Sequence, residues 1–150
     1  MIRWQWCRLD ALTVSQLYTL FSLREAVFVV EQRCAYQELD GRDLAAHHLL
    51  AWTADEQLAG CLRVLAPGVC HAEPAMGRLL VAPASRRQGL GRELMIRGLV
   101  HATGLYPGQA VRISAQAHLQ DFYRSLGFET VTGVYDEDGI AHVGMLRPAA

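Results

Sequence analysis

The spacing of apolar and polar residues changes several times along this chain, and each change predicts a new element. Residues 2–8 alternate between apolar and polar side chains, which is typical of a strand with one buried face. From Thr13 onward the apolar residues recur every three or four positions, which indicates an amphipathic helix. Thr13 and Gln16 have the spacing of a capping box, so we expect the helix to begin there. The pattern runs on into residues 27–30, where β-branched side chains require tertiary support for a helix.

The middle of the chain predicts three strands, followed by a glycine-bearing loop and a second helix. Residues 47–54 and 57–66 form a predicted hairpin, and residues 75–82 form a longer strand. After the loop at residues 86–92, the helix is expected to end near Gly104, a natural residue for a helix C-terminus.

The last third of the chain predicts a strand, a helix and a hairpin. Residues 111–114 alternate as a strand. The helical face that follows stops at Gly127, and it consists of Leu119, Phe122, Tyr123 and Leu126. The final hairpin joins residues 128–135 to residues 140–146 across a turn at residues 136–139.

The resulting order, β-α-α-β-β-β-α-β-α-β-β, predicts a three-layer α/β/α fold around a mixed, mainly antiparallel sheet. The length suits one domain covering residues 1–150, and a hydrophobic fraction of one half excludes a disordered chain. A net charge of −1 argues against nonspecific nucleic-acid binding. No apolar run is long enough to cross a bilayer, and the N-terminus lacks a signal-peptide core, so we expect no membrane attachment.

The cysteines indicate neither a metal site nor a disulfide framework. Cys7, Cys34, Cys61 and Cys70 include no Cys-x-x-Cys spacing, which disfavours zinc binding and thioredoxin-like chemistry. We interpret them as reduced thiols and therefore expect a cytoplasmic protein.

The loop at residues 86–92 carries the clearest chemical signal. Gly89 and Gly91 allow backbone N–H groups to approach a ligand, and the first N–H groups of the following helix lack partners within it. These donors, the helix dipole and three arginines favour a phosphate or pyrophosphate. The spacing is neither a P-loop nor a dinucleotide-binding fingerprint, because Leu94 stands where the latter has its third glycine. Taken alone, the stretch also suits a solvated basic turn that caps a helix.

The motif Arg86-x-x-Gly89-x-Gly91, after a strand that ends Val81-x-Pro83, resembles the acetyl-CoA signature of GNAT-type N-acetyltransferases. Further blocks, spread over nearly the whole chain, resemble the ElaA branch of this superfamily: Phe28-Val29-Val30-Glu31-Gln32, Asp40-Gly41-x-Asp43, Gly77-Arg78, Ala115-Gln116-Ala117-His118-Leu119-Gln120, Phe122-Tyr123, Gly127-Phe128 and Glu137-Asp138-Gly139-Ile140-x-His142. The resemblance implies the GNAT fold and transfer of an acetyl group from acetyl-CoA to a primary amine by direct attack in a ternary complex. The acceptor, a small molecule or an exposed protein amine, does not follow from it, and a homodimer stays open.

The resemblance also assigns residues to acetyl-CoA. Backbone groups of Leu79, Leu80 and Val81 would face pantetheine and the thioester oxygen. The pyrophosphate would be held by the loop that consists of Arg86, Arg87, Gln88, Gly89, Leu90, Gly91 and Arg92. Gln116 stands where members of the family often place an amide on the cofactor, and a local cap of the next helix is the alternative.

The same resemblance gives Tyr123 the role of the general acid that protonates the departing thiolate of the cofactor, although its helical face also suits a core tyrosine.

A base is needed as well, because an amine with a pKa of ~10.4 is almost wholly protonated at pH 7, and removing its proton costs roughly 4–5 kcal/mol. The strands that carry a catalytic glutamate in many members offer none here. Candidates for the base or the acceptor site are Glu31, His48 and His142, with a purely structural histidine as the alternative.

Two charged features have competing interpretations. Residues 34–46 form an acidic predicted loop that suits either a site for a cation or amine or a solvated surface. Arg63 and Arg78 fall in adjacent predicted strands, where they either pair with Glu31 or Asp40 in the core or bind an anionic acceptor. Because buried charges need partners, pairing in the core is the simpler expectation.

Two other functions fit parts of the sequence. A noncatalytic acyl-CoA sensor or interaction module would keep the loop at residues 86–92 but release no thiol with any amine. An acyl-homoserine-lactone synthase is suggested by residues 28–32, which are similar to a segment of those GNAT-like enzymes. The short chain and the intact loop argue against the synthase.

Overall fold

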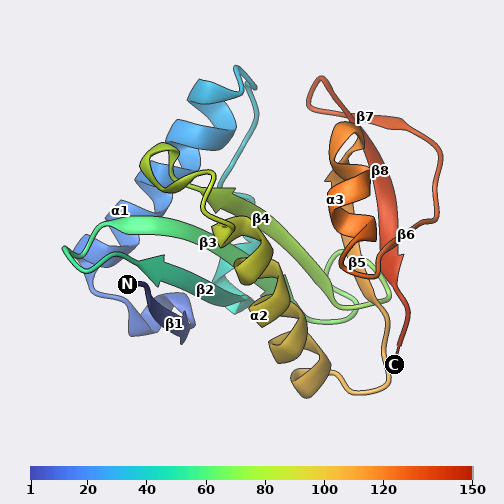
Figure 1. Ribbon diagram of the computed structural model, residues 1–150, viewed down its shortest axis with the longest axis horizontal. Coiled ribbons are helices and arrows are strands. Elements are labelled where there is room, and N and C mark those ends of the chain that lie inside the picture. Colours follow the sequence, from blue (N-terminus) through green and yellow to red (C-terminus); the bar gives the residue numbers. More distant parts are fainter. Residues whose placement is uncertain (150) are drawn as a thin grey trace.

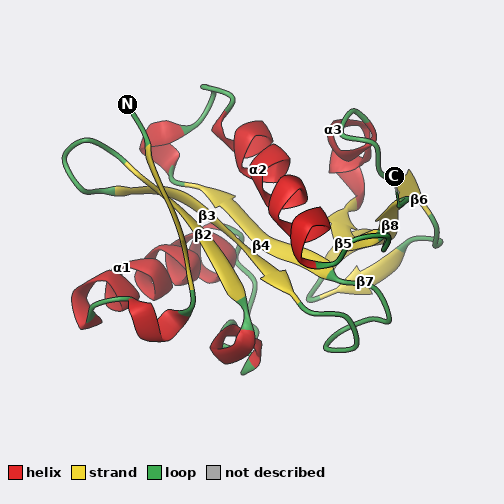
Figure 2. Cartoon of the chain, turned by 90° about the horizontal axis from the view of Figure 1, so that it is seen from below, coloured by secondary structure: helices red, strands yellow, loops and turns green. Residues whose placement is uncertain are grey.

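Residues 1–149, which this computed structural model describes, are organised around one mixed sheet with helices on both faces (Figures 1 and 2). The strands lie in the order β1-β2-β3-β4-β5-β8-β6, with β7 also beside β8. Their bounds are Arg3–Cys7 (β1), His47–Trp52 (β2), Leu58–Leu65 (β3), Ala75–Val81 (β4), Val111–Gln116 (β5), Glu129–Thr130 (β6), Tyr135–Glu137 (β7) and Ile140–Arg147 (β8). The α-helices are Val14–Arg24 (α1), Leu90–Leu105 (α2) and Gln120–Arg124 (α3). The expected α/β fold class is therefore confirmed.

Two apolar layers hold the helices on the sheet. Neighbouring strand residues point to opposite faces, so Leu49 contributes to the layer under α2, and Leu50 to the layer under α1. Helix α1 inserts Leu20, which is fully buried, and α2 inserts Leu94 in the same way. Because β2 and β3 are covered on both faces, nearly all of their residues are buried, and most of these residues are apolar.

The start of α1 follows the sequence prediction, and its continuation does not have regular α-geometry. Thr13 Oγ1 accepts the N–H of Gln16 at 3.1 Å, and Gln16 Oε1 accepts the N–H of Thr13 at 3.0 Å, which completes the capping box. After α1, residues Glu25–Glu31 (η2) form a π-helix, a wider turn that occurs frequently at functional sites. The β-branched run is thus helical, with Val27 buried against the sheet.

The C-terminal hairpin is less regular than the sequence suggested. A continuous strand over residues 128–135 is wrong, because residues 131–134 separate the short strands β6 and β7. Thr132 Oγ1 accepts the N–H of Gly144 at 2.8 Å, so a side chain replaces a neighbouring strand there. The turn is also tighter than expected, with left-handed backbone at Asp138 (φ 54°) and Gly139 (φ 83°). It aligns Tyr135 with His142.

The parallel strands β4 and β5 separate soon after they begin. Ala75 and Arg112 are their single register pair, and the N–H of Arg112 also donates to the carbonyl oxygen of Pro74 at 2.9 Å. Beyond this point β5 stays paired with β8, and β4 stays paired with β3. The middle of the sheet therefore opens toward the carboxyl ends of both strands, and side chains can enter the gap from either wall.

Candidate active site

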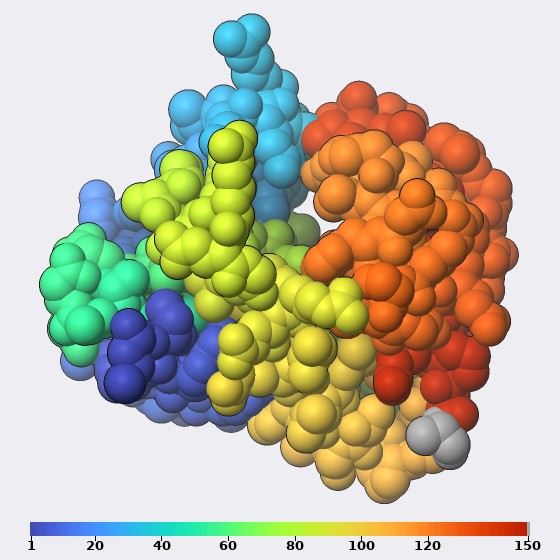
Figure 3. All heavy atoms as spheres, viewed as in Figure 1, coloured from blue at the N-terminus to red at the C-terminus, as the bar shows by residue number. Residues whose placement is uncertain are grey.

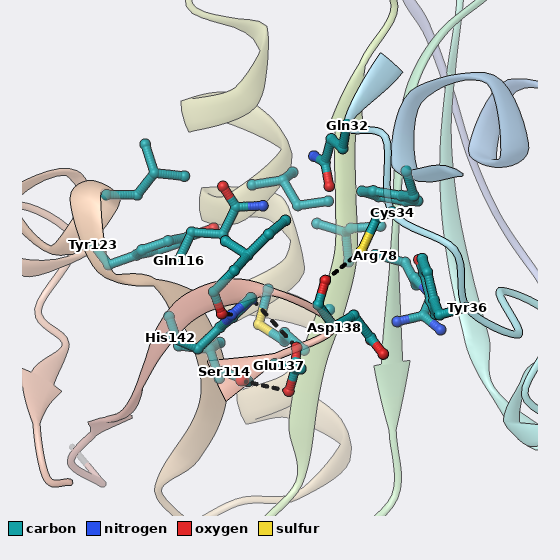
Figure 4. A pocket seen from close by; sticks show the side chains of 18 of the residues that line it. Gln32, Cys34, Tyr36, Arg78, Ser114, Gln116, Tyr123, Glu137, Asp138 and His142 are labelled. Atoms are coloured by element: carbon teal, nitrogen blue, oxygen red, sulfur yellow. Dashed lines mark hydrogen bonds and ion pairs between the residues drawn. The ribbon is translucent and has the colours of Figure 1, made fainter. Parts of the chain in front are cut away.

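A cleft of about 220 Å³ occupies the gap between β4 and β5. Figure 4 shows Gln32, Cys34, Tyr36 and Arg78 on one side, and Ser114, Gln116, Tyr123 and His142 on the other. The space-filling view shows a hollow between the N-terminal and C-terminal parts of the chain (Figure 3). Across the opening, the Cys34 thiol donates to the carbonyl oxygen of Asp138 at 2.8 Å, so the two walls touch there. Burial raises the pKa of this thiol, which keeps it uncharged near neutral pH.

The β4 wall contains a bulge. Cys61 pairs with Leu80 and Arg63 with Gly77, so the register shifts between them, and Arg78 adopts left-handed backbone with φ 51°. Bulges of this kind redirect the backbone and its side chains beside active sites. The Arg78 guanidinium forms ion pairs with Glu38 and with Asp40, the latter at 3.3 Å. These contacts fix a backbone conformation that costs a residue other than glycine roughly 1 kcal/mol or more.

A buried ion network lies behind this wall. Arg24 contacts Asp43 at 2.7 Å and Glu38 at 2.9 Å, while Arg63 contacts Asp40 at 2.6 Å and Asp43 at 3.0 Å. The side chains of Arg24 and Asp43 are 1% and 5% exposed. The acidic loop at residues 34–46 is thus neither solvated at these positions nor free to bind a cation or amine, because its carboxylates are used by arginines.

The network also decides between the expectations for Arg63 and Arg78. Both pair with Asp40, as one alternative held, and neither pairs with Glu31. Burial would raise the pKa of Asp40, but hydrogen bonds from Arg63 and the N–H of Arg42 outweigh it and hold that pKa well below its usual range. An anionic acceptor would have to displace these contacts, so the paired arginines have a structural role.

The loop before α2 has the backbone expected of an anion-binding turn. Arg87 (φ 65°) and Gly89 (φ 75°) are left-handed, and Gly89 is the N-cap of α2 without any side-chain cap. The first N–H groups of the helix, those of Leu90, Gly91 and Arg92, consequently lack a partner within it. Such alternation of backbone conformation collects N–H groups into a concave donor site.

Two of the loop arginines already have protein partners. The Arg86 guanidinium binds both carboxylate oxygens of Glu31, at 2.6 and 2.9 Å, and its Nε donates to the carbonyl oxygen of Val81 at 3.0 Å. Arg92 donates to Ser125 Oγ at 2.8 Å, which connects α2 with the end of α3. Among the described residues, Arg87 makes no side-chain hydrogen bond or ion pair, which leaves its charge available to a ligand.

Tyr123 combines features of both expectations for it. Its ring is part of the core, in edge contact with Phe122 and Phe128 at centroid distances of 5.0 and 6.0 Å. Its side chain also lines the cleft, and within residues 1–149 its hydroxyl has no hydrogen-bond partner. Burial raises the pKa of this hydroxyl to about 12, so it carries its proton at neutral pH.

Gln116 likewise lines the cleft and makes no side-chain cap, so the local-cap alternative is wrong.

A polar cluster on β5, β7 and β8 faces the same cleft. His142 Nε2 lies 3.3 Å from Glu137 Oε2, and Ser114 Oγ donates to Glu137 Oε1 at 3.1 Å. The Tyr135 hydroxyl lies 2.5 Å from Ser114 Oγ. Sequence reasoning had assigned no role to Glu137, Ser114 or Tyr135. An Asp-Gly pair read as a two-residue hairpin turn would have given the correct register and brought these positions together.

Residues 15–147 match the sequence family described as the acetyltransferase (GNAT) domain. The chain belongs to the GNAT acetyltransferase family. ElaA of Escherichia coli is 47% identical over 149 residues, covering 98% of this chain and 97% of its own length. Its crystal structure superposes with a TM-score of 0.90, covering 98% of this chain and 99% of that one. The chain is thus an ElaA-like GNAT protein.

Two further structures share this GNAT fold. An acyl-CoA N-acyltransferase from Pseudomonas aeruginosa is 46% identical, with a TM-score of 0.92 and coverage of 98% of this chain and 99% of that one. BjaI, a CoA-dependent acyl-homoserine lactone synthase, is only 15% identical, with a TM-score of 0.79 and coverage of 97% and 82%. At that identity the likeness extends to the fold alone.

The three candidates for the base differ in their surroundings within the GNAT fold. Glu31 is bound to Arg86, whose hydrogen bond lowers the pKa of this carboxylate. His48 is buried, with Nε2 3.0 Å from the carbonyl oxygen of Asp43, and burial lowers its pKa. Neither residue lines the cleft, whereas His142 does.

Among the helices in residues 1–149 of this GNAT chain, none combines the length and the apolar character that crossing a membrane requires.

Proposed function

We propose that this chain is an N-acetyltransferase that moves an acetyl group from acetyl-CoA to a primary amine by direct attack in a ternary complex. The strongest support is the Tyr123 hydroxyl, which is protonated at neutral pH and has no protein partner within residues 1–149. The hydroxyl is not among the buried polar atoms without a partner, so it is accessible from the cleft and can meet a ligand or a reacting atom there. The cleft is bounded on its other side by the bulge in β4.

The residues present fit acetyl-CoA as a substrate. The unpaired N–H groups at the start of α2 and the charge of Arg87 would hold its pyrophosphate. Backbone groups of Leu79, Leu80 and Val81 would face the pantetheine arm, although the Val81 carbonyl already accepts a bond from Arg86. We therefore assign Arg86 to shaping this loop and Arg87 to contact with the phosphates. Gln116 and Tyr123 would meet the cofactor from the opposite wall.

The chain's own groups then divide the chemistry between them. His142 is the cleft-lining candidate for taking the proton of the ammonium group, so that the nitrogen lone pair can attack the thioester carbon. Backbone N–H groups beside the β4 bulge would stabilise negative charge on the thioester oxygen. Tyr123 would donate a proton to the departing thiolate. The acceptor is an unidentified small molecule or protein amine.

A noncatalytic acyl-CoA sensor is the second candidate, because it would use the same loop and cleft. A sensor has no need of a protonated hydroxyl without a protein partner opposite a polar cluster, whereas a proton donor to a leaving thiolate does, which favours the enzyme. The two are separated by incubating the protein with acetyl-CoA and a panel of primary amines while free thiol is measured. We expect thiol release above the rate of hydrolysis with at least one amine. Binding of CoA without thiol release from any amine would identify a sensor.

The loop assignment predicts that Gly91→Val reduces acetyl-CoA binding without unfolding the protein. Gly91 is helical, and a Cβ there would be 3.6 Å from Val81 Cγ2, an ordinary contact. The added side chain should obstruct the phosphates, so the rise in melting temperature on adding acetyl-CoA should largely disappear. Gly89→Val should in addition lower the melting temperature without ligand, because φ 75° strains any side chain.

Gly104→Val is the matched control for this test, since it adds the same side chain to the same helix where nothing lies within 4 Å. Its thermal shift with acetyl-CoA should equal that of the wild type. Arg87→Ala should weaken binding less than Gly91→Val, because backbone donors carry most of the phosphate contact. An unchanged thermal shift in both glycine variants would place the cofactor elsewhere.

A further inference from the structure

The side chains around His142 form one continuous chain of polar contacts along the C-terminal wall of the cleft. Tyr135 lies on β7. Glu137 extends from β7, Ser114 from β5, and His142 from β8 (Figure 4). Contacts of 2.5, 3.1 and 3.3 Å connect Tyr135 to Ser114, Ser114 to Glu137, and Glu137 to His142. The His142 side chain is 9% exposed, while that of Glu137 is 46% exposed, so the chain runs from the interior to solvent.

The contacts fix where the protons lie. His142 Nδ1 is 2.8 Å from the carbonyl oxygen of Ile140, which can only accept, so Nδ1 carries hydrogen. In a neutral ring Nε2 is then a bare acceptor that faces Glu137 Oε2, a second acceptor, at 3.3 Å. Ser114 uses its single hydrogen on Glu137, so the Tyr135 hydroxyl must be the donor to Ser114.

From this arrangement we infer that Glu137 and His142 act as one dyad that receives the proton of the attacking amine, with Ser114 and Tyr135 as positioning residues. The inference rests on the proposed N-acetyltransferase function. Two acceptors that face each other repel, and a proton between them turns repulsion into attraction. The dyad without this proton carries one negative charge, which also favours an ammonium group at its surface. Glu137 is therefore a catalytic residue that the base candidates from sequence did not include.

The remaining groups that face the dyad do not compete for the proton. Burial raises the pKa of Tyr123 and of Tyr36 to about 12, and burial likewise raises that of the Cys34 thiol. These groups stay uncharged near neutral pH. The Tyr135 hydroxyl on β7 reaches the dyad through Ser114. The other polar groups that line the cleft are the amides of Gln32 and Gln116, the carboxylate of Asp138 in the turn, and the guanidinium of Arg78 on β4, which is paired with Glu38.

These residues account for every proton that moves in the reaction. One of the three ammonium protons passes to the dyad, and the nitrogen lone pair forms the C–N bond to the thioester carbon. The C–S bond then breaks, with its electron pair on sulfur. Tyr123 gives sulfur a proton and recovers one from the nitrogen, and the third proton stays on the amide. Half-exposed Glu137 releases the dyad's proton to water.

The test compares two amines of the same shape. Ethylamine is protonated at neutral pH and needs a base, whereas 2,2,2-trifluoroethylamine is largely unprotonated and does not. With free-thiol detection, Glu137→Gln should lower kcat/KM for ethylamine by about 10²-fold and for trifluoroethylamine only by a few fold. At a pH high enough to deprotonate ethylamine, the loss of kcat/KM that Glu137→Gln causes with this amine should become smaller. Ser114→Ala should show the same selectivity with a smaller loss, and the exposed control Glu129→Gln should match the wild type.

A loss of equal size for both amines, at every pH, would show that Glu137 merely supports the fold and would overturn the inference. A second readout does not depend on turnover. In histidine-selective ¹⁵N NMR, we expect the His142 Nε2 signal to differ between the wild type and Glu137→Gln, because the substitution replaces the carboxylate that Nε2 faces at 3.3 Å. If no amine releases thiol, the proposed function fails while this spectrum still decides on the dyad. An Nε2 signal that is the same in both proteins at every pH would overturn it.

Discussion

Replacing Tyr123 by phenylalanine is expected to lower kcat for acetyl transfer by about 10²-fold or more, with little change in affinity for acetyl-CoA. The substitution removes one oxygen and keeps the ring, which packs against Phe122 and Phe128. Without the hydroxyl, the thiolate must leave unprotonated or take its proton from water. The affinity should hold, because the contacts proposed for the pyrophosphate and pantetheine lie elsewhere, along the loop and β4.

The stability of the Tyr123→Phe variant provides the decisive comparison. The hydroxyl has no hydrogen-bond partner within residues 1–149, so its removal should change the free energy of unfolding by less than the ~1 kcal/mol of one hydrogen bond. Steady-state kinetics and urea unfolding on the same sample measure both quantities. Tyr18→Phe, on the exposed face of α1, is the matched control and should be silent in both. A near-normal kcat would remove Tyr123 from the mechanism and make water the proton source.

Asp43→Asn is expected to destabilise the protein by about 3–5 kcal/mol, a large part of the stability of a small domain. The substitution keeps the shape of the side chain and removes a charge that Arg24 and Arg63 share. Both guanidinium groups are almost fully buried, so the lost attraction is not replaced by water. Glu93→Gln, which breaks an exposed pair with Arg97, should cost no more than about 1 kcal/mol. Urea unfolding of both variants gives the comparison, and equal small losses would contradict the idea that the network stabilises the fold.

The same network predicts how stability depends on pH. Hydrogen bonds and charges from arginines outweigh the effect of burial and hold the pKa values of Asp40 and Asp43 below that of an unfolded aspartate. The unfolded chain therefore takes up protons first as the pH falls. The stabilisation is complete above the ordinary aspartate pKa of ~3.9 and is lost as the pH falls through the lower values of the folded state. Asp43→Asn should flatten this acid limb of the curve, because one of the two shifted carboxyls is gone.

The sequence predicted most clearly those features that depend on neighbouring residues. Local rules of hydrogen bonding and backbone sterics account for the capping box at Thr13, the β2–β3 hairpin and the glycine-bearing loop that opens α2. The motif around Gly89 also led to the correct family.

The features that sequence reasoning missed depend on residues far apart in the chain. Arg24 meets Asp43 only because η2 and the following loop fold back over the sheet, and no periodic pattern encodes that path. The pairing of Glu137 with His142 required the exact register of β7 on β8, which a turn of the wrong length obscured. Glu31 was a candidate base because the sequence does not show that Arg86, 55 residues away, binds its carboxylate.

The early separation of β4 and β5 has a consequence for how the chain folds. The strands β1 to β4 pair almost entirely with their neighbours, and β5 to β8 form a second set of pairings, so the two sets share one register pair at Ala75 and Arg112. Docking of the two sets creates the cleft. The cleft therefore exists only when both sets of strands are in place, so we expect the candidate groups of its two walls to come together late in folding.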